Sequence, residues 1–377
     1  EAGLQVAFIA PTELLAQQHA ETLAKLLNHS PLKNRVALLS GSVKPKIKAD
    51  IKQRLKNNEI SIVVGTHALL QESVNWHKLG LVIIDEQHRF GVGQRQKLHL
   101  KAGHMPHVLC LTATPIPRSL ALTVYGELDV SIIDQAPSTR AGVDTSIISP
   151  NSTAQMYAAV LEQLSAGRQA YVVCPLITES DVLQVASAEK MYKELSQKEF
   201  KSYKVGLLHG RMKAEEKDAV MRDFAAHRLD VLVATTVIEV GVDVANATVM
   251  IVQAADRFGL AQLHQLRGRV GRAEHRGHCY LVLSDSKAPS RRMRAIAGTT
   301  NGFELAELDL EIRGPGAIYG TRQHGSLDLR IAQLTDTKLI AKTREAVQQF
   351  QTKGENLVQY KQIAASVQRA SKLTYLN

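Results

Sequence analysis

Short apolar runs and amphipathic segments alternate along most of the chain. The runs hold few polar residues, which is typical of strands buried on both faces of a parallel sheet. The intervening segments repeat apolar residues at helical spacing, which predicts helices at 13–27, 154–164, 186–195 and 213–225. We predict strands at residues 6–10, 61–64, 81–84, 108–111, 170–174, 204–208, 231–234, 249–252 and 279–283. This alternation predicts doubly wound α/β domains with parallel sheets.

The alternating pattern runs twice and then stops. The first set occupies residues 1–136 and the second residues 143–289, with a linker between them. Residues 290–377 lack the strand pattern, and we expect helices at 291–312 and 328–371. At about 150 residues per domain, the length of 377 residues accommodates two α/β domains and a smaller helical region.

Composition narrows the class of partner and the compartment. The 46 Lys and Arg residues exceed the 36 Asp and Glu residues, and this net charge of +10 suits a polyanionic partner. The three cysteines, Cys110, Cys174 and Cys279, exclude a disulfide framework and fit a reducing compartment. No apolar run approaches 18 residues, so we expect no membrane-spanning helix.

Two acids follow directly after the apolar run at 81–84. Ligands of open α/β sheets bind at the carboxyl ends of strands. Asp85 could hold Mg²⁺ there, and Glu86 could orient and deprotonate an attacking water, as phosphoryl transfer requires. The alternative is a plain strand terminus whose acids cap the next helix. Thr112 and Thr114 follow the next run, and we expect them near the same edge unless they form an ordinary loop.

A cluster of arginines and glycines follows further along the chain. Placed on one helix, Gln265, Arg269 and Arg272 stand at i, i+4 and i+7 and share a face. Gly268 and Gly271 each cost a helix about 1 kcal/mol, so we expect something bulky to approach that face closely. The guanidinium groups could meet the γ-phosphate oxygens of a nucleotide. A solvated basic helix face is the alternative.

Two hydroxyl side chains, Thr235 and Thr236, follow the predicted strand at 231–234. Vicinal hydroxyls and exposed amides suit a nucleic-acid phosphate. Asp243, a few residues later, could face a ribose or an arginine. A strand and loop with a cap is the alternative.

In chain order, these blocks resemble the motifs of a superfamily-2 helicase, and more closely those of RecG, a family of bacterial branched-DNA helicases. Glutamine as the third residue of the motif-II-like block favours RecG over the transcription-repair coupling factor, which shares the translocation motif. The resemblance covers roughly residues 1–330. The segments similar to helicase motifs Ia, Ib, II, III, V and VI are 10–15, 65–67, 85–88, 112–114, 233–243 and 265–272. Those similar to RecG are 85–95, 111–121, 207–217 and 234–247, with a translocation motif at 302–325.

The resemblance implies two RecA-like parallel-sheet domains, the first incomplete at its N-terminus, followed by a small helical C-terminal region. It implies the motor portion of an ATP-dependent DNA helicase or translocase that remodels stalled forks and Holliday junctions in recombination and repair. ATP and Mg²⁺ are the implied cofactors. Branched or forked duplex DNA is the implied partner, with a single-strand-binding protein as a second candidate. The implied state is a monomer in the bacterial cytoplasm, at the nucleoid.

The resemblance also implies a role for each matching residue. Asp85 would bind Mg²⁺, and Glu86 would be the general base. The residues expected to contact the nucleotide are Gln265, Gly241, Asp243, Arg269 and Arg272. Those expected to couple nucleotide state to DNA grip are Gln87, His88, Thr112 and Thr114. Those expected to line the DNA backbone are Pro11, Thr12, Gly65, Thr66, Thr235 and Thr236, and those expected to drive translocation are Arg313 and Gln323.

One part of the family pattern is missing from the sequence. The phosphate-binding loop GxxxxGK[ST] requires a Gly-Lys dipeptide, and none occurs in the 377 residues. The chain starts at Glu1, only nine residues before the motif-Ia-like segment. We therefore expect a piece of a larger protein, without the loop and the N-terminal wedge, that hydrolyses little or no ATP alone. Two alternatives stay open: the motor of a transcription-repair coupling factor, and a module that only binds DNA or a partner.

Three further patterns have open or ordinary interpretations. Eight basic residues and one acid between 33 and 56 could contact phosphates or form a solvated helix face. The apolar spacing at 329–373 favours packing on the second α/β domain, with a partner-binding surface as the alternative. His275, His278 and Cys279 superficially suggest a metal cluster, but Gly277 and the adjacent predicted strand favour a loop.

Overall fold

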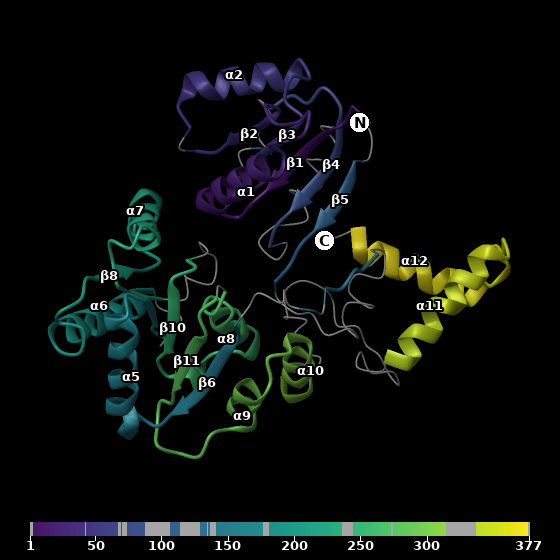
Figure 1. Ribbon diagram of the computed structural model, residues 1–377. Helices are drawn as coiled ribbons and strands as arrows, with labels where there is room; N and C mark the ends of the chain where they lie inside the picture. Colours follow the sequence, from purple (N-terminus) through teal and green to yellow (C-terminus); the bar gives the residue numbers. More distant parts are fainter. Residues whose placement is uncertain are drawn as a thin grey trace. The chain divides into compact units, whose positions relative to one another are not determined.

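The computed structural model divides into two compact units. Figure 1 labels its helices and strands. The first unit comprises Glu1–Ala113, Arg140–Arg257 and Gln265–Lys287, and it holds both sheets. The second comprises Thr114–Thr139, Phe258–His264 and Ala288–Asn377. The structure describes residues 3–41, 43–66, 69, 74–86, 106–113, 129–133, 135, 141–175, 181–235, 244–272, 274–313 and 337–375.

The first sheet has five parallel strands among the described residues, in the order β2-β3-β1-β4-β5. Alternate residues of β1 serve opposite faces. Ala7 packs in one apolar cluster with Leu55 of α2, whereas Phe8 packs in another with Ala16 of α1. The two helices therefore cover opposite faces of the sheet. The elements are β1 (Gln5–Ile9), α1 (Glu13–Leu26), β2 (Val36–Leu39), α2 (Pro45–Lys56), β3 (Ile62–Gly65), β4 (Leu79–Ile84) and β5 (His107–Cys110).

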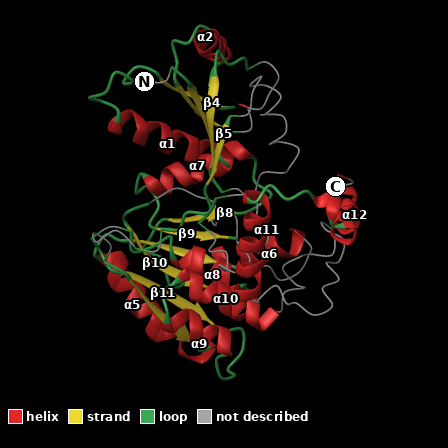
Figure 2. Ribbon diagram, turned by 90° about the vertical axis from the view of Figure 1, so that its right-hand side faces the viewer, coloured by secondary structure: helices red, strands yellow, loops and turns green. Residues whose placement is uncertain are grey.

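The second sheet has six parallel strands in the described part of the chain, in the order β6-β11-β10-β7-β9-β8. Figure 2 labels β8, β9, β10 and β11 of this sheet. On one face of β7, Val172 packs in a cluster with Met156 of α5 and Leu195 of α6. On the other face, the rings of Tyr171 and Phe224 of α7 lie 4.8 Å apart. The strands are β6 (Val143–Ile148), β7 (Gln169–Val173), β8 (Val205–Leu208), β9 (Val231–Ala234), β10 (Ala247–Val252) and β11 (Gly277–Val282). The helices are α5 (Thr153–Ser165), α6 (Asp181–Gln197), α7 (Ala214–Ala225) and α8 (Leu260–Arg267), with 3₁₀ turns at Pro150–Ser152 and Ala255–Arg257.

The remaining described segments are helical. They are α9 (Arg291–Gly298), α10 (Gly302–Arg313), α11 (Thr337–Thr352), a 3₁₀ turn at Leu357–Gln359, and α12 (Lys361–Tyr375). On these last helices, Val347, Val358 and Ile363 are each at least half exposed, so both interpretations of the C-terminal apolar spacing stay open. None of the described helices combines the length and the apolar character that crossing a membrane requires.

The predicted fold class of two parallel-sheet α/β domains is confirmed, with corrections to individual elements. The expectation of helical structure at 291–312 is confirmed, with two helices in that range because two caps divide it. Ser290 accepts a hydrogen bond from the backbone of Met293 at the start of α9, and the Asn301 side chain accepts one from Phe303 at the start of α10. Strands β2 and β6 were not predicted, and helix α2 was only one of the two open interpretations of the basic segment at 33–56.

The two sheets share a strand order and a pattern of side-chain hydrogen bonds. Strands β8-β9-β7-β10-β11 follow the same order as β2-β3-β1-β4-β5. At the start of β1, the Gln5 amide donates to the carbonyls of Leu55 and Ile60, at 2.8 and 2.9 Å. At the start of β7, the Gln169 amide donates to the carbonyls of Phe224 and Leu229, at 2.6 and 2.7 Å. Each buried glutamine thus connects its central strand, by hydrogen bonds, to the end of the helix that precedes the neighbouring strand.

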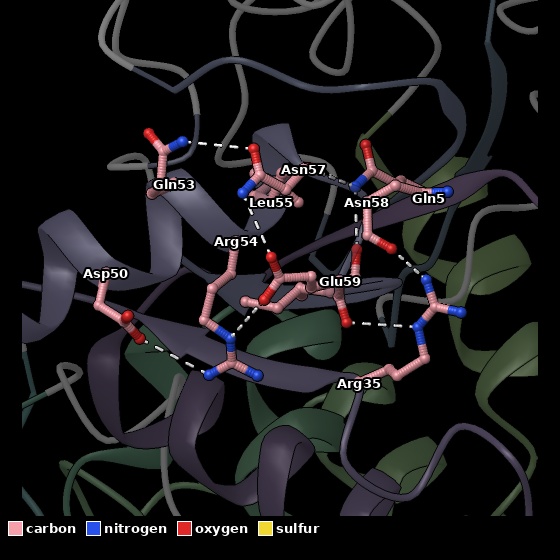
Figure 3. Close-up of polar contacts among 10 residues, drawn as sticks. Gln5, Arg35, Asp50, Gln53, Arg54, Leu55, Asn57, Asn58 and Glu59 are labelled. Carbon is pink, nitrogen blue, oxygen red and sulfur yellow. Dashed lines mark hydrogen bonds and ion pairs between the residues drawn. The ribbon is translucent and has the colours of Figure 1, made fainter.

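Figure 3 shows the polar contacts around the end of α2. Arg54 forms ion pairs with Asp50 and Glu59, both at 3.6 Å. Arg35 donates to the backbone carbonyls of Asn58 and Glu59. Several charges of the basic segment at 33–56 therefore stabilise this corner, while lysines such as Lys46 stay exposed. Whether the segment also meets phosphates remains a prediction.

Candidate nucleotide site

The carboxyl ends of β1, β4 and β5 meet in register at one edge of the first sheet. Ile84 lies opposite Ile9 on one side and Cys110 on the other. The Asp85 amide donates to the Ile9 carbonyl at 2.9 Å, and the Leu111 amide donates to the Ile84 carbonyl at 2.8 Å. This register places Asp85 and Glu86 beside the segment that follows β5. The prediction that the two strand ends share an edge is therefore confirmed as far as Ala113.

Both Asp85 carboxylate oxygens have hydrogen-bond partners. Oδ1 accepts from the backbone amide of Glu86 at 3.0 Å, and Oδ2 lies 3.1 Å from Nε2 of His19 on α1. The Asp85 side chain is 20% exposed, so part of the carboxylate faces solvent. The carboxylate is therefore held in one orientation without being buried.

Glu86 adopts a backbone conformation that is rare for a residue with a side chain. Its φ is +52°, in the left-handed region. Its Oε2 accepts from the Ala113 amide at 3.5 Å, and the residue is only 9% exposed. Strain of this kind is of order 1–3 kcal/mol and often occurs at functional sites. The segment after β5 therefore contacts the predicted general base through its backbone.

A cavity of about 440 Å³ opens at this edge. Such a volume is within the range of small-molecule sites, which is about 300–1,000 Å³. Arg269 and Arg272 also line the cavity, and they belong with Asp85 to the first compact unit. The other lining residues are Leu15, Gln18, His19, Glu21, Thr22 and Lys25 of α1, with Asp85, Glu86 and Ala113. The predicted carboxylates and arginines therefore share one cavity, and Gln265 is absent from its lining.

The carboxylates of Asp85 and Glu86 suit a Mg²⁺ site but do not suit a structural metal site, which needs more protein ligands. Within the described residues, no group of three or more His, Cys, Asp or Glu side chains could hold a metal ion. Mg²⁺ commonly takes only one or two protein carboxylates and completes its shell with water and substrate phosphates. Asp85 and Glu86 meet this requirement. The protein loop that would cradle the phosphates is not present in the sequence, which has no Gly-Lys dipeptide.

The prediction that Gln265, Arg269 and Arg272 share one helix face is wrong. Helix α8 ends at Arg267, before both arginines. Gly271 has a φ of +67°, and a Cβ there would lie 2.6 Å from the Gly142 carbonyl oxygen. The close approach at Gly271 is therefore made by the chain's own backbone and not by a ligand. The arginines follow the helix in an irregular segment, where Nε of Arg272 donates to the Gly268 carbonyl at 2.8 Å.

The residues predicted to line DNA have structural roles as well. Thr12 is the N-cap of α1, and its hydroxyl accepts from the Leu15 amide at 3.3 Å. Gly65 is buried, and Thr66 follows it at the end of β3. Thr235 is only 3% exposed, so its side chain is not at the surface. Pro11 lies half-buried immediately before the N-cap of α1.

Some predicted site residues lie outside the described part of the chain. They are Gln87, His88, Thr114, Thr236, Gly241, Asp243 and Gln323. Arg313 is the last residue of α10. Thr112, in contrast, is described, and it lies exposed beyond β5.

Two residues near the predicted motifs were not identified from the sequence. His19 contacts Asp85 across 66 positions, and its helical spacing carried no signal of that contact. Arg267 is 4% exposed, and burial lowers its pKa. Its charge lies near the Cys279 thiol, whose pKa burial raises to about 12. A buried arginine just before the two expected finger residues had no distinguishing pattern in the sequence.

Three family descriptions match the chain in succession. Residues 1–123 match DEAD/DEAH box helicase, and residues 154–274 match the helicase conserved C-terminal domain. Residues 299–370 match ATP-dependent DNA helicase RecG, domain 3, C-terminal. The last match favours RecG over the transcription-repair coupling factor.

Curated relatives agree with that assignment. ATP-dependent DNA helicase RecG of Thermotoga maritima is 48% identical over 359 residues, which are 95% of this chain and 46% of the relative. RecG of Synechocystis sp. is 46% identical over 99% of this chain and 45% of the relative. RecG of Bacillus subtilis is 50% identical over 88% of this chain and 48% of the relative. The chain thus spans about half the length of these relatives.

Solved structures show the same likeness. A structure of RecG bound to a three-way DNA junction matches with a TM-score of 0.74 and 44% identity, covering 92% of this chain and 44% of that chain. The Mycobacterium smegmatis helicase Lhr bound to ssDNA and AMP-PNP matches with a TM-score of 0.54 at 17% identity, over 75% of this chain and 40% of that one. The second likeness shows the fold alone. With the sequence identities, the first shows that most of this chain is similar to about half of RecG, an ATP-dependent DNA helicase.

Proposed function

We propose that this chain is the motor portion of a longer ATP-dependent helicase or translocase that remodels branched DNA in recombination and repair. The observation that carries the proposal is the match, over 92% of the chain, to a RecG structure bound to a three-way DNA junction. The cavity beside Asp85 and Glu86 supplies a matching place for ATP with Mg²⁺. The expected substrate is forked or Holliday-junction DNA at the bacterial nucleoid.

Within that proposal, each cavity residue has a chemical role. Asp85 would hold Mg²⁺, whose charge would neutralise phosphate oxygens. Glu86 would accept the proton of the attacking water. Arg269 and Arg272 would stabilise charge on the transferred phosphoryl group, with Gln265 as a further nucleotide contact. Their positions on one cavity support these roles for the carboxylates and the arginines.

The remaining proposed roles concern DNA and movement. Coupling between nucleotide and DNA is assigned to Gln87, His88, Thr112 and Thr114, with Gly241 and Asp243 beside the nucleotide. The DNA backbone track is assigned to Pro11, Thr12, Gly65, Thr66, Thr235 and Thr236. Translocation is assigned to Arg313 and Gln323. Residues 1–136 and 143–289 would act as the two motor domains and residues 290–377 as the coupling region, in a monomer that a single-strand-binding protein could recruit.

The 377 residues by themselves are proposed to turn over little ATP. The sequence has no Gly-Lys phosphate loop, and backbone amides of such a loop provide much of the grip on the β- and γ-phosphates. The chain alone would then act only as a DNA- or partner-binding module. Comparing ATP turnover of this chain with that of the full-length parent, each with forked DNA, tests this point. Robust DNA-stimulated turnover by the chain alone would contradict it.

The motor assignment is tested by Arg272→Ala in the full-length parent. Loss of an arginine finger reduces turnover by about 10³–10⁵-fold. We expect DNA-stimulated ATP hydrolysis and fork unwinding to be lost while binding of forked DNA persists. The matched control is Arg276→Ala, because Arg276 is exposed and pairs with Asp144 at 2.6 Å, away from the cavity lining. Unwinding that survives Arg272→Ala would show that the finger is assigned wrongly.

A further inference from the structure

His19 lies outside the segments that resemble helicase motifs, and it contacts Asp85, which lies inside one. Nε2 of His19 lies 3.1 Å from Oδ2 of Asp85, and the two residues are 66 positions apart. An ionised carboxylate can only accept hydrogen bonds, so Nε2 carries the hydrogen and donates it. His19 therefore acts on the proposed metal-binding carboxylate from a different element, helix α1.

The imidazole ring packs against an aromatic neighbour in addition to its contact with Asp85. Its centroid lies 4.5 Å from that of the Phe8 ring on β1, with an interplanar angle of 36°. Phe8 is itself packed with Leu15 and Ala16 of α1. The His19 side chain is 31% exposed, so roughly two thirds of it is covered. A donor fixed in this way loses little further rotamer freedom when it forms the bond to Asp85.

The two hydrogen bonds to Asp85 together fix the plane of its carboxylate. The Glu86 amide donates to Oδ1 at 3.0 Å, and His19 donates to Oδ2. A carboxylate offers about four lone-pair positions, so these bonds leave positions for a cation. Both His19 and Asp85 line the same cavity. Partners of this kind around metal-binding groups orient them and tune metal affinity.

We propose that His19 is a positioning residue that holds Asp85 in the orientation that binds the divalent cation of the nucleotide. The proposal rests on the function proposed above, because it assumes that Asp85 binds the cation. It predicts that cation affinity depends more on the Nε2 donor than on the aromatic ring. Glutamine is the informative replacement, because its amide nitrogen is the same number of bonds from the backbone as Nε2.

The experiment measures Mn²⁺ affinity of the full-length parent with a non-hydrolysable ATP analogue, using the electron paramagnetic resonance of free Mn²⁺. Loss of such a partner typically weakens metal affinity by about 10–100-fold, and we expect this range for His19→Leu. His19→Gln is expected to restore most of the affinity. His29→Leu is the matched control, since His29 is exposed beyond the end of α1.

Three results would overturn the proposal. The first is wild-type Mn²⁺ affinity in His19→Leu, and the second is tighter binding, which would mean that His19 competes with the cation. The third is a loss of affinity in His19→Gln as large as in His19→Leu, with a lower unfolding temperature in both, which indicates a purely structural role. Asp85→Asn tests the proposed function separately from the role of His19. Unchanged Mn²⁺ affinity in that variant would mean that Asp85 is not a ligand.

Discussion

The ring of Tyr157 on α5 illustrates how burial controls a single ionisable group. Its edge faces the ring of Phe200, with centroids 5.9 Å apart. Burial, with a smaller effect of Glu199, raises the pKa of Tyr157 to about 12, and a hydrogen bond with Gln253 acts in the opposite direction. The folded chain thus keeps this phenol neutral at a pH where the unfolded chain ionises it.

Stability is therefore expected to fall in alkali. The Tyr157 contribution is complete below its ordinary pKa of 10 and is lost as the pH rises toward 12. The loss amounts to about 1–2 kcal/mol once solvent screening of the ring is allowed for. Tyr157→Phe removes the ionisable group, so urea unfolding at pH 8, 10 and 11.5 should show a shallower decline in the variant. The buried thiols of Cys174 and Cys279 titrate in both proteins, and equal slopes would contradict the assignment.

Single residues at the strand end were predictable from sequence, and their partners were not. The apolar run predicts a strand, and ligands bind at the carboxyl ends of such strands. The two acids that follow the run, Asp85 and Glu86, could therefore be identified. The left-handed backbone of Glu86 and its contact with Ala113 have no such pattern. His19 was missed for the same reason: its partner is brought near by the pairing of β1 with β4, which is a long-range event.

Strand β3 depends on a glycine at its last residue. A Cβ at Gly65 would lie 2.2 Å from the Leu39 carbonyl oxygen of the paired strand β2. Backbone at that distance must shift, and overpacking of this kind costs about 1–3 kcal/mol or more. We expect Gly65→Ala to lower the free energy of unfolding by about 3 kcal/mol in urea titrations.

Gly298→Ala is the matched control for Gly65→Ala. No atom lies within 4 Å of a Cβ at Gly298, in the last turn of α9. Alanine also favours helix, so this variant should be neutral or slightly more stable. If the two variants unfold alike, the close approach of β2 to Gly65 does not constrain the first sheet.

For whole strands and helices, the extent of their burial determined which of them could be predicted from the sequence. The predicted strands are mostly the continuous apolar runs in the interior of the sheets, such as β10, which is buried throughout. The missed strands β2 and β6 lie at the edges, and β6 carries polar residues such as Asp144 and Ser146. Helix α2 stayed an open alternative because its exposed lysines conceal two buried positions, Ile51 and Leu55. The segment at 265–272 was wrongly predicted to be one helix. Residue spacing alone does not show that the helix ends before Gly268 and Gly271.

At the scale of the molecule, the repeated arrangement provides two separate cores. The cluster around Ile9 and Leu55 belongs to the first sheet, and the cluster around Val172 and Phe200 belongs to the second. Each core has a buried glutamine that bonds two backbone carbonyls. Gln5 also accepts from the amides of His77 and Lys78, at 2.8 and 3.1 Å. Replacing either glutamine with leucine would remove these hydrogen bonds, and a buried backbone group left unpaired typically costs about 1–3 kcal/mol. The carbonyls of Leu55 and Phe224 would still accept from the amides of Asn58 and His227.

Because the cores are separate, we expect Gln5→Leu and Gln169→Leu to loosen different halves of the chain. Hydrogen exchange measured by mass spectrometry should show faster exchange in peptides from β1 to β4 for the first variant, with peptides from β7 to β11 unchanged. Gln169→Leu should give the reverse, and the double variant should show both effects, since distant sites act additively. Gln17→Leu is the control, because Gln17 is exposed on α1, where its amide donates to the Glu21 carboxylate at 2.9 Å. Faster exchange throughout both sheets in either single variant would mean that the two cores unfold as one cooperative unit, and that the repeat does not confer independent stability.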